Sequence, residues 1–261
     1  MRTVAIQRGY KVGHITRSLR PPVRKNSLVE PITELNKIKI KDNGEPLVDL
    51  TKHCPQIAFH NEPDFWGERR LYYARRAVAN MLNEAQSFLP KGYKLYITSS
   101  YRTLDKQRKI YQRVYRRFKR AHPEWPENIL RRQVNRFVHP PDIPTPPGHC
   151  TGGAIDLTIL GPDGKELNMT APYKWGTRNS RKVAATNVNG ITKQARRNRQ
   201  LLIEAMSRAG FTNYAGEWWH WSYGESCWAW RLGRKTAIYG IAEPPENSDP
   251  TRGRTTRRRA P

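Results

Sequence analysis

The chain has 261 residues, of which 37% are hydrophobic and 26% charged, so it can form one substantial domain with a modest core. Its 47 Lys and Arg against 22 Asp and Glu give a formal charge of +25. Such a surface attracts polyanions, whether nucleic acid, acidic cell-wall polymer or anionic lipid, but it identifies neither a partner nor a reaction. Three cysteines without CxxC spacing exclude a disulfide scaffold and are typical of reduced thiols in the cytosol.

The segments outside the core predict a cytoplasmic protein with basic arms. No apolar run reaches the roughly 18 residues that cross a bilayer, and the beginning of the chain lacks the short apolar stretch of a secretory signal. No acidic residue precedes Glu30, whereas seven Lys and Arg residues do. We interpret this segment as a disordered basic arm, with a targeting segment as the alternative.

In chain order, residues 1–45 are expected to be irregular, because "RPPVRKN" disfavours regular structure. Residues 68–89 carry apolar side chains at helical spacing and predict an amphipathic helix. Residues 93–101, "YKLYITSSY", alternate in polarity and predict a strand that ends at Ser99 and Ser100.

A basic helix is predicted next, over residues 103–121, with one apolar face and one cationic face. The cationic face is either simply solvated or binds a polyanion. Its members are Lys106, Lys109, Arg113, Arg116 and Arg120. Residues 127–138 predict a second short helix, and the proline-rich residues 139–149 predict a rigid loop.

The rest of the core predicts a strand at 152–160 that continues through a "GPDG" turn into a hairpin with 165–169. A helix follows at 192–211, closed by Gly210, and "GEWWHWSYGE" at 216–225 predicts another strand. The expected fold is a single α+β domain at 46–243. It has a central antiparallel sheet flanked by helices, a metal site at the sheet edge, and irregular basic arms at 1–45 and 244–261.

Two of the seven histidines stand out by their surroundings. His149 precedes Asp156 by seven residues where a loop enters a strand, and His220 follows Glu217 by three. A hydrolytic zinc site needs about three protein ligands and an open position for water, and His149, Asp156 and His220 supply that set. Glu217 is close enough to take a proton from that water and pass it to a leaving amine. By spacing alone, two unrelated strand histidines remain the alternative.

The motifs "SSYRT", "GHCTGGAIDLTI" and "GEWWHWSYGE" occur in this order. Together they resemble the zinc D-alanyl-D-alanine dipeptidase family known from vancomycin resistance, which is related in fold to D-Ala-D-Ala carboxypeptidases and the hedgehog signalling domain. The family's H-x(6)-D and E-x-x-H motifs are both present, and the resemblance covers about residues 49–241.

The resemblance implies that one Zn²⁺ is bound by His149, Asp156 and His220, and that Glu217 is the general base. It also implies that Arg102 stabilises the charge on the scissile carbonyl oxygen, for which a permanently cationic fork of donors is suited. Trp218 and Trp219 should alternate between the wall of the substrate pocket and the packing of the sheet against a helix.

The sequence departs from the family pattern at the substrate-binding positions. Pro147 and Gly148 stand close to where the family commonly has a serine that helps to hold the substrate. Lys174 stands near the position of an aspartate that binds the substrate's amino group, and a lysine there would repel an ammonium. Cys150, beside His149, could add a soft ligand, although strand-like geometry would turn its side chain away.

Three functions are therefore compared. The first is a zinc D-alanyl-D-alanine dipeptidase that acts on a small peptide and removes D-Ala-D-Ala from cell-wall synthesis. The second is a D,D-carboxypeptidase or other peptidoglycan peptidase, favoured by the altered substrate-binding positions. The third is a non-catalytic basic binding protein that keeps only the fold. The complete set of ligands, base and arginine argues against the third, and the high positive charge argues for it.

Overall fold

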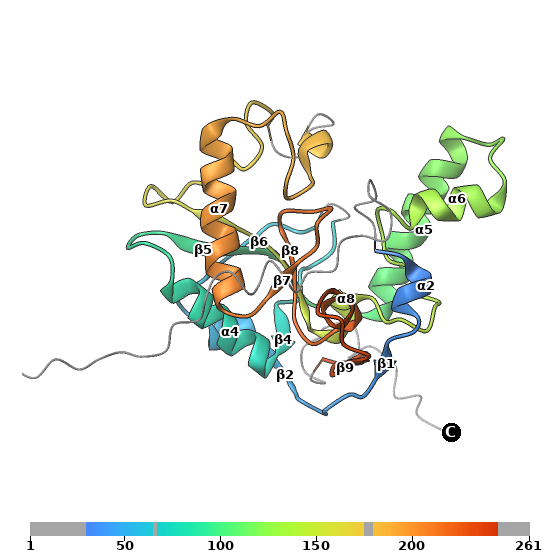
Figure 1. Ribbon diagram of the computed structural model, residues 1–261, viewed down its shortest axis with the longest axis horizontal. Coiled ribbons are helices and arrows are strands. Elements are labelled where there is room, and N and C mark those ends of the chain that lie inside the picture. Colours follow the sequence, from blue (N-terminus) through green and yellow to red (C-terminus); the bar gives the residue numbers. More distant parts are fainter. Residues whose placement is uncertain (1–29, 65–66, 175–179, 245–261) are drawn as a thin grey trace, which may run out of the picture.

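A five-stranded mixed sheet forms the centre of the computed structural model, which describes residues 30–64, 67–174 and 180–244 (Figure 1). The strands lie in the order β3-β5-β6-β8-β7. They are β3 (Ala58–Phe59), β5 (Lys94–Ser99), β6 (Ala154–Leu160), β8 (His220–Ser222) and β7 (Thr212–Asn213). β3 and β5 are parallel, and the other neighbours are antiparallel. The sequence predicted an antiparallel central sheet; the observed sheet is mixed, because its edge strand β3 runs parallel to β5.

The central strand β6 is buried on both faces. Ile155, Leu157 and Ile159 are fully buried in the main hydrophobic core, while the alternate residues Asp156 and Thr158 point to the opposite face because side chains alternate along a strand. One face of the sheet therefore belongs to the core, and the other can present polar side chains to a ligand.

Two helices, α4 (Arg76–Ser87) and α7 (Lys193–Arg208), supply apolar side chains to that core. α7 agrees with the predicted helix: the side chain of Thr192 accepts a hydrogen bond from Ala195 N, and Gly210 adopts a φ of 95° just after the helix. α4 begins later than predicted. Residues 73–75 form the strand β4 (Tyr73–Arg75), paired with β2 (Leu47–Asp49), so tertiary pairing overrides the helical pattern of residues 68–75.

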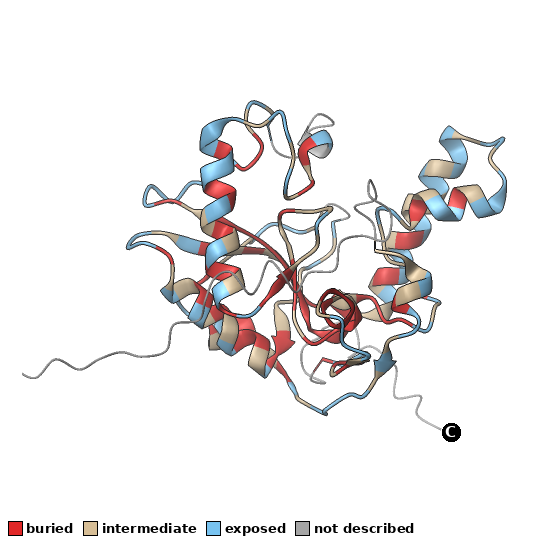
Figure 2. Ribbon diagram, in the orientation of Figure 1, coloured by how far each residue is buried: buried red, intermediate tan, exposed pale blue. Residues whose placement is uncertain are grey.

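The helices α5 (Leu104–Ala121) and α6 (Glu127–Val134) form a hairpin that projects from the body of the molecule and is largely exposed along its outer surface (Figures 1 and 2). Thr103 begins α5, as its side chain accepts a hydrogen bond from Lys106 N. Residues 139–147 contain no helix or strand, as the prolines predict. The 3₁₀ turn η2 (Gly148–Thr151) then leads into β6.

The predicted irregular arm at 1–45 is wrong for residues 30–45. They form α2 (Ile32–Leu35) and β1 (Lys39–Ile40), which pairs in parallel with β9 (Thr236–Ala237). Ion pairs join Glu30 to Arg231, in α8 (Ser226–Arg231), and Asp42 to Arg75. Elements this short have no detectable periodicity, and their partners lie far away in the chain. The rest of the two arms, 1–29 and 245–261, lies outside the described residues.

Smaller differences concern the ends of strands. The hairpin predicted after β6 is reduced to one bridge, between Leu160 and Glu166. Of "GEWWHWSYGE" only residues 220–222 are in a strand, and Glu225 instead caps α8 by accepting hydrogen bonds from the main-chain N–H groups of Cys227 and Trp228. Two short helical segments, α3 (Leu50–His53) and η3 (Ser180–Val183), complete the described elements.

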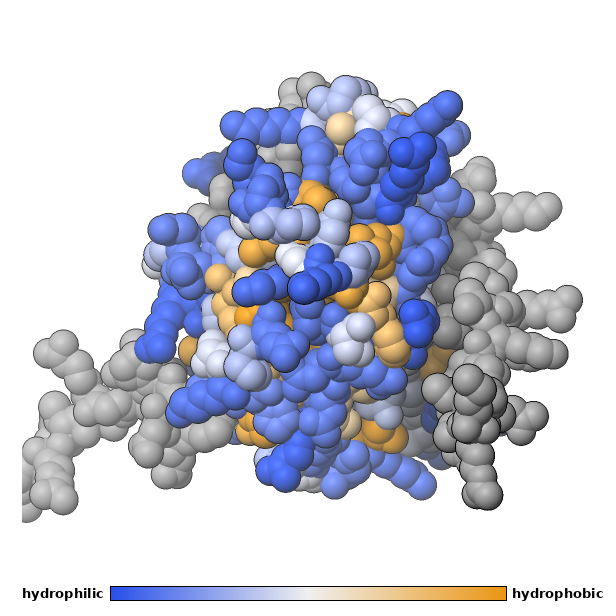
Figure 3. Space-filling view, turned by 90° about the vertical axis from the view of Figure 1, so that its left-hand side faces the viewer, coloured by the Kyte–Doolittle hydropathy of each residue, from blue (hydrophilic) through white to orange (hydrophobic). Residues whose placement is uncertain are grey.

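On the face shown in Figure 3, hydrophilic residues predominate, and hydrophobic side chains appear in small groups between them. In the part of the chain that the structure describes, no helix is both long and apolar enough to cross a bilayer.

Candidate active site

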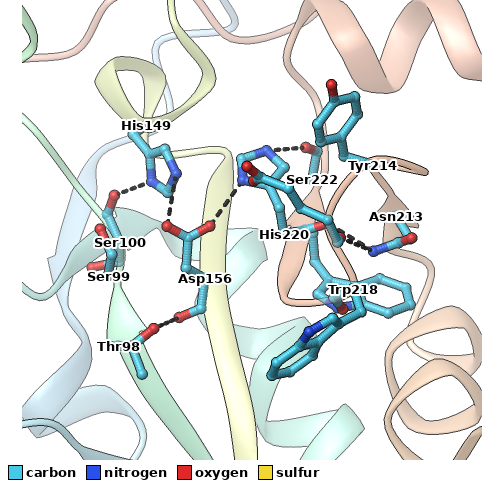
Figure 4. Close-up of polar contacts among 12 residues, drawn as sticks. Thr98, Ser99, Ser100, His149, Asp156, Asn213, Tyr214, Trp218, His220 and Ser222 are labelled. Carbon is cyan, nitrogen blue, oxygen red and sulfur yellow. Dashed lines mark hydrogen bonds and ion pairs between the residues drawn. The ribbon is translucent and has the colours of Figure 1, made fainter. Parts of the chain in front are cut away.

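His149, Asp156 and His220 lie together on the polar face of the sheet (Figure 4). One potential ligand atom from each residue lies within 4.8 Å of the others. Asp156 is central: its Oδ2 is 3.3 Å from His149 Nε2, and its Oδ1 is 2.9 Å from His220 Nδ1. Among the described residues this is the cluster whose donor set matches a metal site.

The strand register brings these residues together. Asp156 in β6 lies opposite His220 in β8 and, on its other side, opposite Ser99 at the end of β5. The register of the β5–β6 pairing shifts between Ile97 and Ser99, just before β5 ends. His149 lies in η2. Its main-chain carbonyl oxygen accepts a 3.1 Å hydrogen bond from Arg102 N, which joins η2 to the end of β5. Three neighbouring segments thus converge on Asp156.

Both imidazole rings are oriented by further hydrogen bonds. His149 Nδ1 is 2.6 Å from the carbonyl oxygen of Ser100, which accepts its proton and leaves Nε2 facing Asp156 without one. His220 Nε2 is 3.5 Å from Ser222 Oγ, while Nδ1 faces Asp156. A carbonyl that holds the far ring nitrogen is the usual support of a metal-binding histidine.

The charges at the cluster suit a cation. Burial and the Arg102 guanidinium lower the pKa of His149, so its imidazole stays neutral. Burial raises the pKa of Asp156, but the two histidines outweigh burial and hold that pKa well below its ordinary value. Burial lowers the pKa of His220, yet Asp156 outweighs it and raises that pKa. Positive charge is thus favoured beside an ionised Asp156, and two imidazoles with one carboxylate are a typical zinc donor set.

Glu217 lies in the turn that leads into β8. Its main chain is held by hydrogen bonds from Glu217 N to Tyr214 O (3.0 Å) and from Asn213 Nδ2 to Glu217 O (3.0 Å). Burial raises the pKa of its carboxyl group to about 7, since loss of water disfavours the charged form. A carboxylate that titrates near neutrality is suited to take up and release a proton.

Arg102 follows the end of β5. Its Nε and Nη2 donate to Ser99 Oγ at 3.3 and 3.1 Å, and Nη2 also lies 3.1 Å from Asp156 Oδ2. The guanidinium is therefore placed next to the His149, Asp156 and His220 cluster.

Two cavities meet at this cluster. The first, of about 230 Å³, is lined by His149, Asp156 and His220 together with Glu217, Arg102 and Trp219. The second, of about 390 Å³, shares Arg102, Asp156 and Trp219 with the first, and extends past Asp64 and Lys106. Arg102 and Asp156 therefore lie where the two cavities adjoin, whereas Glu217 lines only the first.

The other predicted residues are placed as follows. Trp219 lines both cavities, whereas Trp218 is buried in the core with the Arg199 guanidinium 5.6 Å from its ring, although its side chain also reaches the second cavity. Lys174 is exposed and is not among the residues that line either cavity. Cys150 is fully buried, and burial raises the pKa of its thiol to about 12, which opposes a role as thiolate ligand.

Other residues of the first cavity were not singled out from the sequence. They include Tyr214, whose ring lies edge-on to His220, and the Glu30–Arg231 ion pair. Ser99 and Ser100, which line the second cavity and accept hydrogen bonds from Arg102 and His149, were not singled out either. The "SSYRT" motif could have indicated them, because it also contains Arg102. Glu30 carries no such signal, since it lies in a segment that looked irregular.

Comparison with known proteins identifies the family. A family model described as D-ala-D-ala dipeptidase matches residues 64–234. A D-alanyl-D-alanine dipeptidase from Synechocystis is 28% identical over 243 residues, which cover 82% of this chain and 98% of the relative.

Solved structures give weaker matches. A vancomycin-resistance D,D-pentapeptidase, VanY, in complex with Zn(II) is 17% identical with a TM-score of 0.34, covering 72% of this chain and 88% of that one. VanYB in complex with D-alanine-D-alanine is 16% identical with a TM-score of 0.36, covering 76% and 93%. The assignment rests on the sequence matches, and the His149, Asp156 and His220 cluster agrees with it. The chain belongs to the D-Ala-D-Ala dipeptidase family and is a zinc-dependent metallopeptidase.

Proposed function

We propose that this enzyme hydrolyses the free dipeptide D-Ala-D-Ala, with Glu217 as general base and Arg102 as the stabiliser of the carbonyl oxygen. The observation that carries the proposal is the convergence of Glu217, Arg102 and a His/Asp/His cluster on one cavity of about 230 Å³. That volume is below the roughly 300–1,000 Å³ typical of pockets for drug-sized ligands, as suits a substrate of two small residues.

The residues proposed to hold zinc are His149, Asp156 and His220. The neutral state of His149, the ionised state of Asp156 and the hydrogen bond from His149 to the Ser100 carbonyl support this assignment. Zinc bound in such a site lowers the pKa of water and polarises a carbonyl group.

Glu217 would take one proton from the attacking water, whose oxygen forms the new bond to the scissile carbonyl carbon. The same carboxyl group would then give that proton to the peptide nitrogen as the C–N bond breaks. Two D-alanine molecules result, and one water is consumed. A pKa raised to about 7 makes both proton transfers accessible near neutral pH.

Arg102 would donate to the carbonyl oxygen as negative charge develops there. A guanidinium has five N–H donors, and Ser99 and Asp156 accept from only part of them. These two neighbours hold the cation in place before the substrate arrives, so little reorganisation is needed during the reaction.

A D,D-carboxypeptidase acting on longer peptides is the second candidate. The observation in its favour is the second cavity of about 390 Å³, which adjoins the first at Arg102 and Asp156 and could take residues on the amino side of the scissile bond. The third candidate, a non-catalytic binding protein, has no use for a base such as Glu217 beside the metal ligands.

The deciding experiment compares hydrolysis of D-Ala-D-Ala with that of an N-acylated peptide ending in D-Ala-D-Ala, with and without a chelator. The dipeptidase predicts the higher kcat/KM for the free dipeptide and loss of activity with the chelator. The opposite preference would support the carboxypeptidase, and no turnover of either by zinc-loaded protein would refute both.

We further propose that the α5–α6 hairpin contacts polyanions. Five of its exposed cations have no carboxylate partner among the described residues, and attraction to phosphate or carboxylate polymers follows from that charge. These are Lys109, Arg116, Arg117, Arg120 and Arg132. The cytoplasmic location also remains a proposal, supported by three free cysteines.

A further inference from the structure

One carboxylate in the catalytic cavity has no role in the hydrolysis described above. Three of the residues lining the 230 Å³ cavity carry carboxyl groups: Glu30, Asp156 and Glu217. Asp156 lies between the two histidines and Glu217 is the proposed base, which leaves Glu30. It lies outside residues 64–234, so this wall of the cavity comes from a segment that the family model does not cover.

Glu30 is held in place by a buried partner. Its Oε1 is 2.5 Å from Arg231 Nε, and Arg231 Nη1 also donates to Thr212 Oγ1 (3.0 Å) and Thr212 O (3.3 Å). The side chain of Arg231 is only 4% exposed, against 11% for Glu30. Both side chains line the cavity, and the carboxylate is the more exposed member of the pair.

The carboxylate can accept further hydrogen bonds. An ionised carboxyl group offers about four acceptor positions. Arg231 Nε uses one, and the thiol of Cys227, which also lines the cavity, interacts with Glu30 as a hydrogen-bond partner. The other acceptor positions of the carboxylate oxygens are available to hydrogen bonds from a charged N–H group.

A free dipeptide brings such a donor into the cavity. Its amino end is an ammonium group at neutral pH, and an ammonium removed from water without an anionic partner is strongly disfavoured. Asp156 is already occupied, and Lys174 carries the wrong sign and does not line the cavity. We propose that Glu30 is a specificity-determining residue whose carboxylate binds the substrate's ammonium group, so that the enzyme selects the free dipeptide over peptides with a blocked amino end. This inference rests on the proposed peptidase function.

The test uses full-length zinc-loaded protein and two substrates, D-Ala-D-Ala and N-acetyl-D-Ala-D-Ala. Replacement of the charged acceptor in Glu30→Gln should lower kcat/KM for the free dipeptide roughly 10- to 100-fold, mainly through KM. The value for the acetylated substrate should change little. The conservative variant Glu30→Asp keeps the charge and should retain more of the selectivity than Glu30→Gln.

Asp42→Asn is the matched control. Asp42 also anchors the segment before β2 by a pair with a buried arginine, Arg75, at 2.6 Å, but it lines neither cavity. Its replacement should lower the melting temperature without changing the ratio of the two specificity constants.

The outcomes are distinct. If Glu30→Gln lowers both specificity constants equally, their ratio is unchanged, as expected for Asp42→Asn. Glu30 is then only a structural anchor and the inference is wrong. If Glu30→Gln does not fold, the double variant Glu30→Gln with Arg231→Gln, which leaves no unpaired buried cation, replaces it. An unchanged ratio of the constants in that variant refutes the inference, and a reduced ratio supports it. If the wild type hydrolyses neither substrate, the proposed function fails instead.

Discussion

Asp156 in β6 and His220 in β8 are directly opposite each other in an antiparallel pair, with Oδ1 of one 2.9 Å from Nδ1 of the other. The two residues are far apart in sequence, so the candidate metal site depends on the register of the sheet. A slip by one residue would turn one of the two side chains to the core face.

His220→Ala should therefore remove zinc while most of the sheet remains. The two remaining ligands cannot complete the roughly three-ligand set that a catalytic zinc site needs. Zinc content of purified protein, measured by mass spectrometry, should fall from about one per chain to a small fraction. Ser222→Ala, which removes only a hydroxyl 3.5 Å from His220 Nε2, serves as the control and should keep its zinc. Full zinc in His220→Ala would contradict the ligand assignment.

Glu217→Gln should keep zinc but lower kcat by about 10²- to 10⁴-fold, the usual contribution of a general acid or base. Glutamine preserves the shape of the side chain but cannot take up the proton. The measurement is steady-state hydrolysis of D-Ala-D-Ala at several pH values, with zinc content determined on the same sample. Glu225→Gln, which affects the cap of α8 instead, is the comparison. Turnover within a few-fold of wild type would exclude Glu217 as the base.

Arg102→Ala should lower kcat by roughly 10²- to 10³-fold, as does removal of one donor to a developing oxyanion. Arg102→Lys should restore part of the rate, because it returns the charge without the planar fork. The exposed Arg117 in α5 supplies the control, and Arg117→Ala should leave the rate unchanged. Equal rates for wild type and Arg102→Ala would show that the guanidinium does not contact the reacting carbonyl.

The Asp42–Arg75 pair should make stability depend on pH at the acid end. Burial raises the pKa of Asp42, but hydrogen bonds from Gly44 N, Gly240 N and Arg75 outweigh it, and the pKa is lowered overall. A lowered pKa means that the folded state binds the proton less well. The stabilisation is thus complete above the unfolded pKa of about 3.9 and is lost as pH falls through the folded value.

The measurement is urea unfolding of wild type and Asp42→Asn between neutral pH and pH 2. The difference in unfolding free energy between them should be largest at neutral pH and should shrink below about pH 4. Asp105→Asn, whose carboxyl group is 83% exposed, should show almost no such change. A difference between wild type and Asp42→Asn that grows towards low pH would reverse the sign of this prediction.

The triple variant Arg116→Gln, Arg117→Gln and Arg120→Gln should weaken binding of a short DNA duplex, used as a polyanion probe. For duplex DNA, the slope of log K against log salt falls by about 0.9 for each phosphate that the protein no longer neutralises. Peptide hydrolysis should be unaffected, because these side chains do not line the cavities. Removal of residues 1–27 and 245–261 tests the arms by the same titration. An unchanged slope in both variants would exclude polyanion binding by these regions.

Long periodic segments and the two central strands β5 and β6 were predictable from the sequence, whereas short segments with distant partners were not. α5 follows from its apolar and cationic faces and the end of α7 from Gly210, since helical hydrogen bonds are local. The early part of the predicted helix at 68–89 became β4 because β2 was available to pair with it. The same limit applies to residues 30–45, whose partners Arg231 and β9 lie at the other end of the described chain.

The sequence by itself determined which residue types stand in the motifs, namely His149, Asp156, Glu217 and His220, and through the resemblance it indicated the family and a candidate zinc donor set. Only the tertiary structure decided which other groups share that cavity. It places Trp219 at the wall and Lys174 outside, and it brings Glu30 to the cavity through the buried Arg231. The physical reason is that ligand spacing within a motif is local, whereas the walls of a cavity are assembled from segments that meet only after the sheet has formed.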